Sequence, residues 1–270
     1  MEQSFFIESE FVDFINHPQN RKEFIQKMLN DNGLDAPILQ MDGKNHIYVN
    51  FPKEEYSRNK TIKTIIAHYD IYPGSPGAND NSFAVSCILK WAVWLHKGYQ
   101  NSQAQHNVRV IFTDGEECGE DGVKSQGAFP LAKVFKNLNI VNDDIFVFDC
   151  MGRGDVPCIC NCSIPFSPNS FFGKKYNALE QKACVAISKI SNGNCFKIKS
   201  NYSDNASFLA NGIPAICITM LPFDELQKYI FLKKIPDTWK ILHSKEDSIN
   251  NLTFNSYIKC FQLLTEILKV

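Results

Sequence analysis

The sequence predicts an α/β fold in which helices cover both faces of a mostly parallel sheet. Short apolar runs rich in Val, Ile and Phe alternate with longer segments whose apolar residues recur at helical spacing. Such alternation is typical of parallel strands joined by crossover helices. Of the 270 residues, 44% are hydrophobic and 21% are charged, which is enough apolar material for a sizeable core.

The amino-terminal thirty residues predict two short helices or one bent helix. Phe11, Phe14 and Ile15 recur at helical spacing, and so do the apolar residues of 24–29. Pro18 lies between the two groups and interrupts a continuous helix.

The next segments predict strands and the first crossover helix. Residues 46–51 (HIYVNF) have the pattern of a strand, and residues 61–67 (TIKTIIA) that of a buried strand. Prolines and glycines at 73–77 then form a loop. A helix is expected at 82–95, followed by a strand at 108–113 (VRVIFT).

The remainder of the chain repeats this alternation. Helical spacing predicts helices at 129–137 and 177–190 and a closing helix at 248–268. Apolar runs predict strands at 145–148 (IFVF) and at 212–219 (GIPAICIT), the latter entered through a turn.

Length and charge limit the classes of protein. Length permits one large domain or two small ones, and because no repeat, low-complexity tract or linker is visible, we expect residues 1–270 to form one domain. The net charge of −1 provides no basic stripe for nucleic acid and no polybasic patch for a membrane surface. No stretch approaches the ~20 apolar residues of a spanning helix. The first residues lack the pattern of a signal peptide, which favours a cytoplasmic protein and leaves a secreted mature form open. The oligomeric state is not predicted.

The ten cysteines predict free thiols rather than disulfides. Four of them lie in apolar runs: Cys87, Cys184, Cys217 and Cys260. Buried thiols of a reducing compartment explain these positions. Cys158, Cys160 and Cys162 alternate, so a strand would place their sulfurs on one face. Zinc sites usually need a different spacing and a fourth ligand, so we interpret this cluster as a thiol-rich loop.

Polar side chains gather where the apolar strands end. The groups at strand ends are His68, Asp70, Asp114, Glu116, Glu117 and Asp149. Asp80 lies in the loop after His68, just before a helix, and His243 lies in the loop before the last helix. The carboxyl ends of parallel strands share one edge of a sheet, so these groups are expected to lie together. So many buried carboxylates repel one another unless a cation is bound.

A mixture of imidazole and carboxylate ligands suits zinc, and two ions would lie about 3.5–4 Å apart, bridged by a carboxylate and a water. Manganese or cobalt is an alternative metal. Asp70, two residues after His68, is placed to accept the other imidazole N–H and fix the tautomer.

Each of these signals is weak when taken alone. An Asp before a helix, such as Asp80, is more often a helix cap, and Glu116–Glu117 is also compatible with a solvated pair. The remaining histidines are interpreted as surface or hydrogen-bonded residues: His17, His46, His96 and His106.

Taken together, the motifs resemble those of the co-catalytic zinc aminopeptidases, the family that also contains glutamate carboxypeptidase II and the glutaminyl cyclases. Six blocks run in the family's order: His68-Tyr-Asp70; Pro76-Gly-Ala-Asn-Asp80-Asn81; Glu116-Glu117-Cys-Gly119; Phe148-Asp149-Cys-Met-Gly152-Arg-Gly-Asp155; Ser203-Asp204 with Gly212-Ile-Pro-Ala215; and His243-Ser-Lys-Glu-Asp247-Ser248. Six ordered blocks are far more specific than one motif.

The resemblance implies a single α/β/α sandwich around a mixed sheet and a zinc-dependent exopeptidase, most simply an aminopeptidase acting on peptides. It implies that His68 and Asp149 share one zinc ion, that Glu117 and His243 bind the other, and that Asp80 bridges them. Glu116 would be the general base, taking a proton from the water between the metals and passing it to the leaving amine.

Two departures from the family pattern stand out. Phe83 follows the bridging Asp80 where the family usually has small residues. Asn205 replaces the His of a Ser-Asp-His pattern, which puts rate or pocket shape in question more than metal binding.

Substrate preference and rival functions stay open. The apolar segment 221–242 predicts either an apolar pocket for the substrate side chain or simple packing of a long loop; its apolar residues include Phe223, Tyr229, Ile230, Phe231, Leu232 and Trp239. Tyr202 is interpreted either as an oxyanion donor or as a surface residue. A glutaminyl cyclase with one zinc ion, a non-catalytic binding module and a hydrolase of non-peptide amides are the alternatives.

Overall fold

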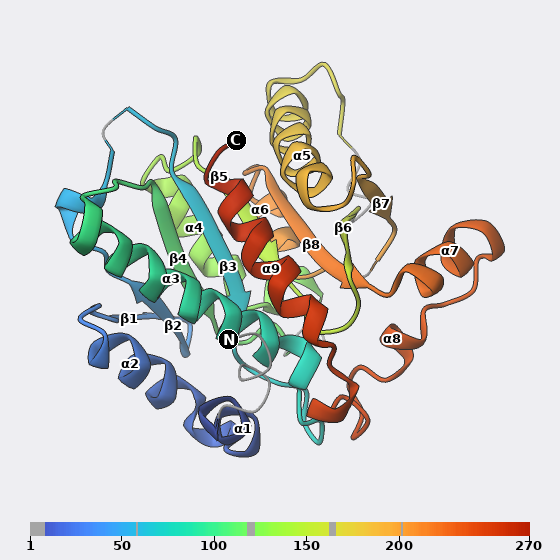
Figure 1. The fold of residues 1–270 in the computed structure, drawn as a ribbon. Helices are drawn as coiled ribbons and strands as arrows, with labels where there is room; N and C mark the ends of the chain where they lie inside the picture. Colours follow the sequence, from blue (N-terminus) through green and yellow to red (C-terminus); the bar gives the residue numbers. More distant parts are fainter. Residues whose placement is uncertain (1–8, 58, 118–121, 162–165, 201) are drawn as a thin grey trace.

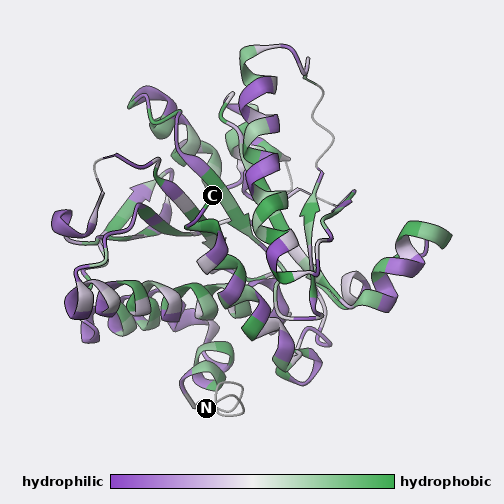
Figure 2. Cartoon of the chain, turned by 45° about the horizontal axis from the view of Figure 1, so that its top comes forward, coloured by the Kyte–Doolittle hydropathy of each residue, from purple (hydrophilic) through white to green (hydrophobic). Residues whose placement is uncertain are grey.

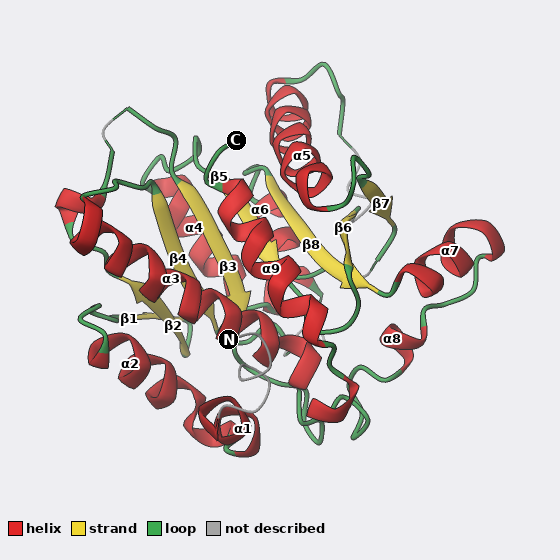
Figure 3. Ribbon diagram, viewed as in Figure 1, coloured by secondary structure: helices red, strands yellow, loops and turns green. Residues whose placement is uncertain are grey.

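The computed structural model describes residues 9–57, 59–117, 122–161, 166–200 and 202–270. Within this part of the chain one mixed sheet runs through the molecule with helices on both faces (Figures 1 and 3). The order of its strands is β1-β2-β4-β3-β5-β8-β6-β7. The strands are β1 Ile38–Met41, β2 Lys44–Val49, β3 Lys63–His68, β4 Val108–Thr113, β5 Asp144–Phe148, β6 Val156–Cys160, β7 Phe196–Ile198 and β8 Ala215–Leu221.

The centre of the sheet is parallel and is joined to both flanks by antiparallel pairs, while the edge strand β7 pairs in parallel with β6. β4, β3, β5 and β8 pair in parallel, whereas β1 with β2, β2 with β4, and β6 with β8 are antiparallel. The expected mixed, mostly parallel sheet is therefore confirmed. The parallel centre decides the location of the site, because it brings the carboxyl ends of β3, β4 and β5 to one edge.

Helices form the two outer layers. In Figure 1, α3 and α9 cross one face of the sheet while α4 and α6 lie behind it, and α7 and α8 stand to one side. The helices are α1 Ser9–Asn16, α2 Arg21–Asp31, α3 Phe83–Ser102, α4 Ala128–Asn137, α5 Phe171–Ile190, α6 Asn205–Ala210, α7 Phe223–Leu232, α8 Asp237–Lys240 and α9 Phe254–Ile267. None of the described helices is long and apolar enough to cross a membrane.

The period-two pattern of the strands divides the core into two layers. On β3, Ile65 and Ala67 pack in the cluster that contains the buried residues of α3, α5 and α9, while Ile66 between them packs with α4 and α6. β4, β5 and β8 alternate in the same way. Both faces of these strands are therefore buried, which explains their continuous apolar runs (Figure 2).

Most predicted elements are present, with shifted ends. The pattern missed the strands β1, β6 and β7 and the helices α6–α8; of these helices α6 and α8 are short, whereas α7 has ten residues. The helix expected from residue 248 begins at Phe254, after a separate turn at Ile249–Asn251. The interpretation of Cys158 and Cys160 as part of a loop is wrong. Both lie on β6, buried on the face opposite Ile159 because strand side chains alternate. Cys162 lies outside the described residues.

Candidate metal centre and active site

Strand register brings two of the predicted residues, His68 and Asp149, to one edge of the sheet. His68 is the last residue of β3 and pairs with Thr113, the last residue of β4. Ile66 of β3 pairs with Val147 of β5, so Asp149, two residues further on, arrives beside His68. The Nε2 atom of His68 lies 3.6 Å from an Asp149 carboxylate oxygen. The carboxyl ends of neighbouring parallel strands thus supply the first half of the cluster.

Asp80 joins two halves of the site. Its Oδ1 atom lies 3.1 Å from His68 Nε2, and its Oδ2 atom lies 3.3 Å from His243 Nε2. His243 Nε2 is also 3.1 Å from Glu117 Oε2. One carboxylate therefore faces two imidazoles, each with a second carboxylate beside it: Asp149 on one side and Glu117 on the other. Asp80 makes no helix-capping hydrogen bond, so the alternative role as a cap is wrong.

The two halves differ in their access to solvent. The side chain of His68 is fully buried, whereas that of His243 is 50% exposed. Tyr72 stacks on the His243 imidazole with ring centroids 4.4 Å apart and an interplanar angle of 8°. The stacking contact orients the half-exposed His243 imidazole. A ligand can approach the cluster from the His243 side.

Asp70 lies between His68 and the turn that carries Glu116 and Glu117. Its Oδ1 atom accepts the Glu116 N–H at 3.2 Å and lies 3.5 Å from His68 Nδ1. Its Oδ2 atom accepts the Glu117 N–H at 3.0 Å. The Asp70 carboxylate therefore fixes the backbone of the Glu116–Glu117 turn. It faces His68 Nδ1 but makes no hydrogen bond to it, so the orienting role toward His68 stays a prediction.

Glu116 and Glu117 are not a solvated pair. The Glu117 side chain is 4% exposed and points to His243. Glu116 turns elsewhere and accepts a hydrogen bond from Gln126 Nε2 at 2.9 Å. Adjacent residues in an extended turn point apart, which lets one carboxylate face the predicted metals while the other stays available for proton transfer.

The loop that carries Asp80 is fastened from two sides. Asp247 accepts the N–H groups of Asn79 and Asp80, at 2.8 and 3.1 Å. Arg21 of α2, which is 2% exposed, donates to the carbonyl groups of Tyr69 and Pro76 and to Ser82 Oγ. The backbone of the bridging residue is therefore held by contacts that involve no metal.

The charged groups of the site strongly perturb one another's pKa values. Burial disfavours a charged His68, but the carboxylates of Asp149 and its neighbours outweigh burial and raise the pKa of this imidazole. Burial raises the pKa of Glu117 to about 8, with a further contribution from the Asp80 charge, and burial raises the pKa of Glu116 well above its ordinary value. For Asp80, hydrogen bonds from the two histidines overcome burial and lower the pKa. A divalent cation would compete with protons for these groups.

Unsatisfied buried atoms fit a metal site. Among the described residues, His68 Nδ1 and Nε2, Glu117 Oε1 and Asp149 Oδ1 are buried without a hydrogen-bond partner. Ligand atoms of His68, Asp80 and Glu117 lie within 4.8 Å of one another, and so do those of Asp80, Asp149 and Cys150. Buried polar atoms normally have partners, so orphans that converge in this way mark where a cation belongs. Cys150 adds a sulfur atom that the sequence analysis did not consider.

A sequence comparison decides the family. The model of peptidase family M28 matches residues 47–268, which is most of the chain and includes all five predicted ligand positions.

The chain belongs to peptidase family M28. The predicted family is thereby confirmed, and the coarse class is a peptidase. A search of curated proteins finds no match.

Solved structures share the M28 fold. The LapA aminopeptidase of Legionella pneumophila has a TM-score of 0.64 and 17% identity, over 97% of this chain and 64% of that one. BSAP, a zinc aminopeptidase from Bacillus subtilis, has a TM-score of 0.57 and 17% identity, over 83% and 48%. Porphyromonas gingivalis glutaminyl cyclase has a TM-score of 0.64 and 16% identity, over 93% and 88%. The chain thus spans less than two thirds of the two aminopeptidases.

The two departures from the M28 motifs have structural explanations. Phe83 is fully buried and packs against Gly152, where an added Cβ would lie 2.8 Å from its Cγ; the bulky residue therefore fills the core beside the site. Asn205 is buried, and its Oδ1 atom accepts the Ser203 N–H at 3.3 Å. Asp204, which lies between Ser203 and Asn205 in the chain, is fully buried and accepts a hydrogen bond from Thr113. Burial raises its pKa to about 7.

The segment proposed to approach the substrate forms α7 and α8. Tyr229, Ile230 and Trp239 pack against a small core cluster beneath β6, which agrees with the packing alternative for these residues. Phe223 and Phe231 are exposed, and Leu232 beside them as well. A substrate pocket in this segment stays a prediction, and so does an oxyanion role for Tyr202, which is 46% exposed.

The remaining histidines each make at least one hydrogen bond, although the buried Nε2 atom of His46 has no partner among the described residues. His96 and His106 both contact the buried carboxylate of Glu55, at 2.5 and 3.1 Å. His46 Nδ1 accepts the Asp114 N–H, and His17 bonds a backbone carbonyl in α1.

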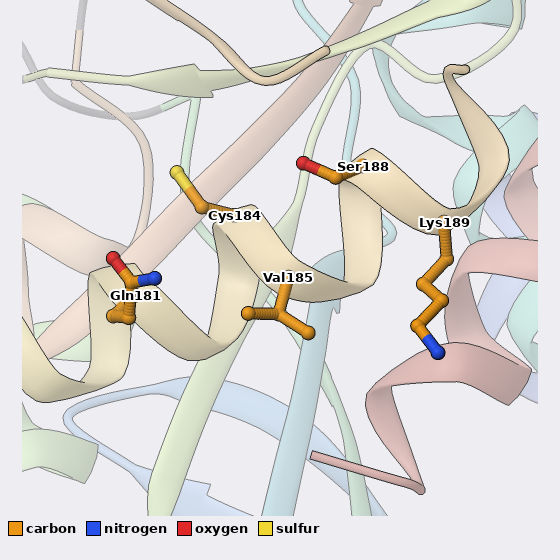
Figure 4. Close-up of a pocket in the computed structure, with 5 residues that line it drawn as sticks. All are labelled: Gln181, Cys184, Val185, Ser188 and Lys189. Carbon is orange, nitrogen blue, oxygen red and sulfur yellow. The ribbon is translucent and has the colours of Figure 1, made fainter. Parts of the chain in front are cut away.

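A surface hollow on α5 lies apart from the cluster. Figure 4 shows its lining, which consists of residues of α5 alone: Gln181, Cys184, Val185, Ser188 and Lys189. None of them belongs to the predicted site, and the hollow offers no converging carboxylates.

Several residues of the site were missed by sequence reasoning. Arg21 had a signal, because it shares a helix face with Ile25 and Leu29 and a charge on an apolar stripe needs buried partners. Gln126 and Tyr72 had none, since each lies in a loop whose path only the fold determines.

Proposed function

We propose that this M28 chain is a zinc-dependent exopeptidase, and specifically an aminopeptidase that removes N-terminal residues from peptides with two zinc ions per chain. The observation that carries the proposal is the Asp80 carboxylate, whose two oxygens face His68 and His243 at 3.1 and 3.3 Å. A carboxylate between two histidine–carboxylate pairs fits two metal ions better than one.

The donor set assigns a role to each side chain. His68 and Asp149 would hold one zinc ion, Glu117 and His243 the other, and Asp80 both. Bound zinc supplies Lewis acidity toward the scissile carbonyl and lowers the pKa of water. Asp70 keeps the His68 tautomer fixed and the glutamate turn in place.

Glu116 is the proposed general base. It accepts a proton from the attacking water and delivers it to the leaving amine. Its pKa is raised by burial, which makes its carboxylate a better proton acceptor than an exposed glutamate. The side chain is held by Gln126 rather than by a predicted ligand, so metal binding and proton transfer use different carboxylates.

Amino-acid release from aminoacyl amides and dipeptides tests the proposal. Zinc-loaded protein is expected to release the N-terminal amino acid, to lose activity with a chelator and to contain two zinc ions by elemental analysis. Glu116→Gln is expected to keep both zinc ions and to lose at least about a hundredfold in kcat. Absence of release from every substrate, with two zinc ions bound, would refute the aminopeptidase.

A glutaminyl cyclase is the second candidate. It is supported by the fold likeness to the Porphyromonas gingivalis cyclase, whose TM-score of 0.64 equals that of the LapA aminopeptidase. Pyroglutamate formation from peptides with N-terminal Gln, at one zinc ion per chain, would favour it over the aminopeptidase.

A further inference from the structure

Glu116 is held by a buried side-chain relay that begins on another element. Gln126 follows the turn Val123–Ser125 and is 2% exposed. Its Nε2 atom donates to Glu116 Oε1 at 2.9 Å. Ser207 of α6, which is fully buried, donates its hydroxyl to Gln126 Oε1 at 2.8 Å. The Gln126 amide thus connects the Glu116 carboxylate with helix α6.

The two contacts set the orientation of the amide. A carboxylate only accepts hydrogen bonds, so the Gln126 amide must turn its NH₂ group toward an ionised Glu116. That orientation leaves Oε1 facing Ser207, whose hydroxyl donates to it. A flipped amide would place an oxygen against the Glu116 carboxylate, which is repulsive in a buried site.

The backbone around Gln126 leaves it little freedom. The following residue, Gly127, donates its N–H to the Gly115 carbonyl at 2.9 Å, directly before Glu116. A Cβ atom on Gly127 would lie 1.8 Å from the Asp114 carbonyl oxygen, so the close approach of the two turns requires glycine. The turn of the amide donor is therefore fastened to the turn of the base.

We propose that Gln126 is a positioning residue of the reaction, which fixes one oxygen of Glu116 so that the other faces the attacking water, and that Ser207 sets the orientation of the Gln126 amide. This proposal rests on the proposed function of Glu116 as the general base. Among the described residues no hydrogen bond to Glu116 Oε2 is present, so this oxygen is available for the proton. The carboxylate is then aimed before substrate binds.

Steady-state kinetics of Gln126→Met, which keeps the volume and removes the donor, test the proposal. The substitution removes a hydrogen bond to the charged carboxylate of the base and to no other group of the site. It is therefore expected to lower kcat about ten- to a hundredfold, with KM within about twofold. Ser207→Ala, which lets the amide turn over, is expected to lower kcat about three- to tenfold. Gln26→Met is the matched control, because it removes a half-buried glutamine that donates only to the Ala36 carbonyl of the amino-terminal region.

Combination with Glu116→Gln separates positioning from a general effect on the fold. Gln126→Met is expected to change nothing further in the Glu116→Gln background, because the group it positions is already absent. An equal loss of kcat in both backgrounds, or a wild-type kcat for both Gln126→Met and Ser207→Ala, would overturn the relay.

A crystal structure supplies a readout that does not depend on turnover. In the wild type Glu116 is expected to keep its contact with Gln126, and in Gln126→Met the carboxylate is expected to rotate while all five predicted ligands stay in place. An unmoved carboxylate would contradict the proposal. Absence of activity in the wild type would instead refute the proposed function and leave this structural test of the relay intact.

Discussion

Replacing Asp70 with Asn changes one atom of a side chain on which three contacts converge. Oδ1 accepts the Glu116 N–H at 3.2 Å and lies 3.5 Å from His68 Nδ1, and Oδ2 accepts the Glu117 N–H at 3.0 Å. An amide has one accepting oxygen, so its NH₂ group must face at least one of these N–H groups. Either orientation of the Asn side chain therefore leaves one backbone N–H group without an acceptor, and one orientation also turns the NH₂ group toward His68.

The magnitude follows from the hydrogen bond that the variant cannot make. A buried N–H group left without its acceptor costs about 1–3 kcal/mol, so the metal-free Asp70→Asn variant is expected to unfold with a free energy lower by about that amount. Metal binding is expected to weaken by a similar free energy, because the carboxylate faces the predicted ligand His68 and fixes the turn of Glu117. Loss of such a partner typically weakens metal affinity about ten- to a hundredfold.

Competition with a chromophoric chelator measures the zinc affinity, and urea unfolding measures the stability of the same samples. Asp143→Asn is the matched control, since Asp143 accepts hydrogen bonds from Thr64 and Arg109 at the start of β3, the end opposite His68. If Asp70→Asn bound zinc as tightly as the wild type, the orienting role of this carboxylate would be refuted.

Four further predictions concern other parts of the chain. Arg21→Met removes the donor to two loop carbonyls and is expected to lower the free energy of unfolding by about 3 kcal/mol, measured by urea denaturation, with weaker zinc binding. Glu55→Gln leaves one of its two buried histidine partners badly paired and is expected to cost about 1–3 kcal/mol in the same assay; an unchanged midpoint would contradict this. Burial lowers the pKa of Lys90 from 10.5 to about 8, so between these pH values this group binds a proton in the unfolded chain but not in the folded chain, and its own contribution to stability rises with pH. Buried cysteines such as Cys87 and Cys150, whose pKa values burial raises, act in the opposite sense, so the test is a difference between variants: the free energy of unfolding of Lys90→Met minus that of the wild type should fall as pH rises through this window, whereas the same difference for the exposed Lys97→Met should stay constant. Zinc affinity should rise from pH 6 to about 8 in chelator competition, because Glu117, with a pKa of about 8, must lose its proton to bind; a flat profile would speak against it as a ligand.

The parallel centre of the sheet was the most predictable part of the fold. The strand at Val108–Thr113 was predicted to the residue, because both of its faces are buried and its sequence is a nearly continuous apolar run. The short outer strands were missed for the opposite reason. β7 spans only Phe196–Ile198, and β6 contains Pro157 and two cysteines, so neither has a strand-like composition.

Some residues of the candidate site were likewise predictable from sequence patterns, and others were not. His68 and Asp149 follow buried strands, and the geometry of a parallel sheet alone brings them together. His243 lies far along the chain after α8, and only the six-block resemblance indicated that it reaches Asp80. Gln126 lies between a turn and a helix, and no periodicity or motif signals that its amide meets a carboxylate ten residues earlier.

One short turn gives two neighbouring glutamates different partners. Asp70 binds both of their backbone N–H groups, so the turn itself is fixed. From that fixed backbone the Glu116 side chain leads to Gln126, and that of Glu117 leads to His243. These partners come from the chain's own hydrogen bonds and packing. Because these hydrogen bonds already set the directions of both side chains, we expect a cation bound by the predicted ligands to order little further backbone.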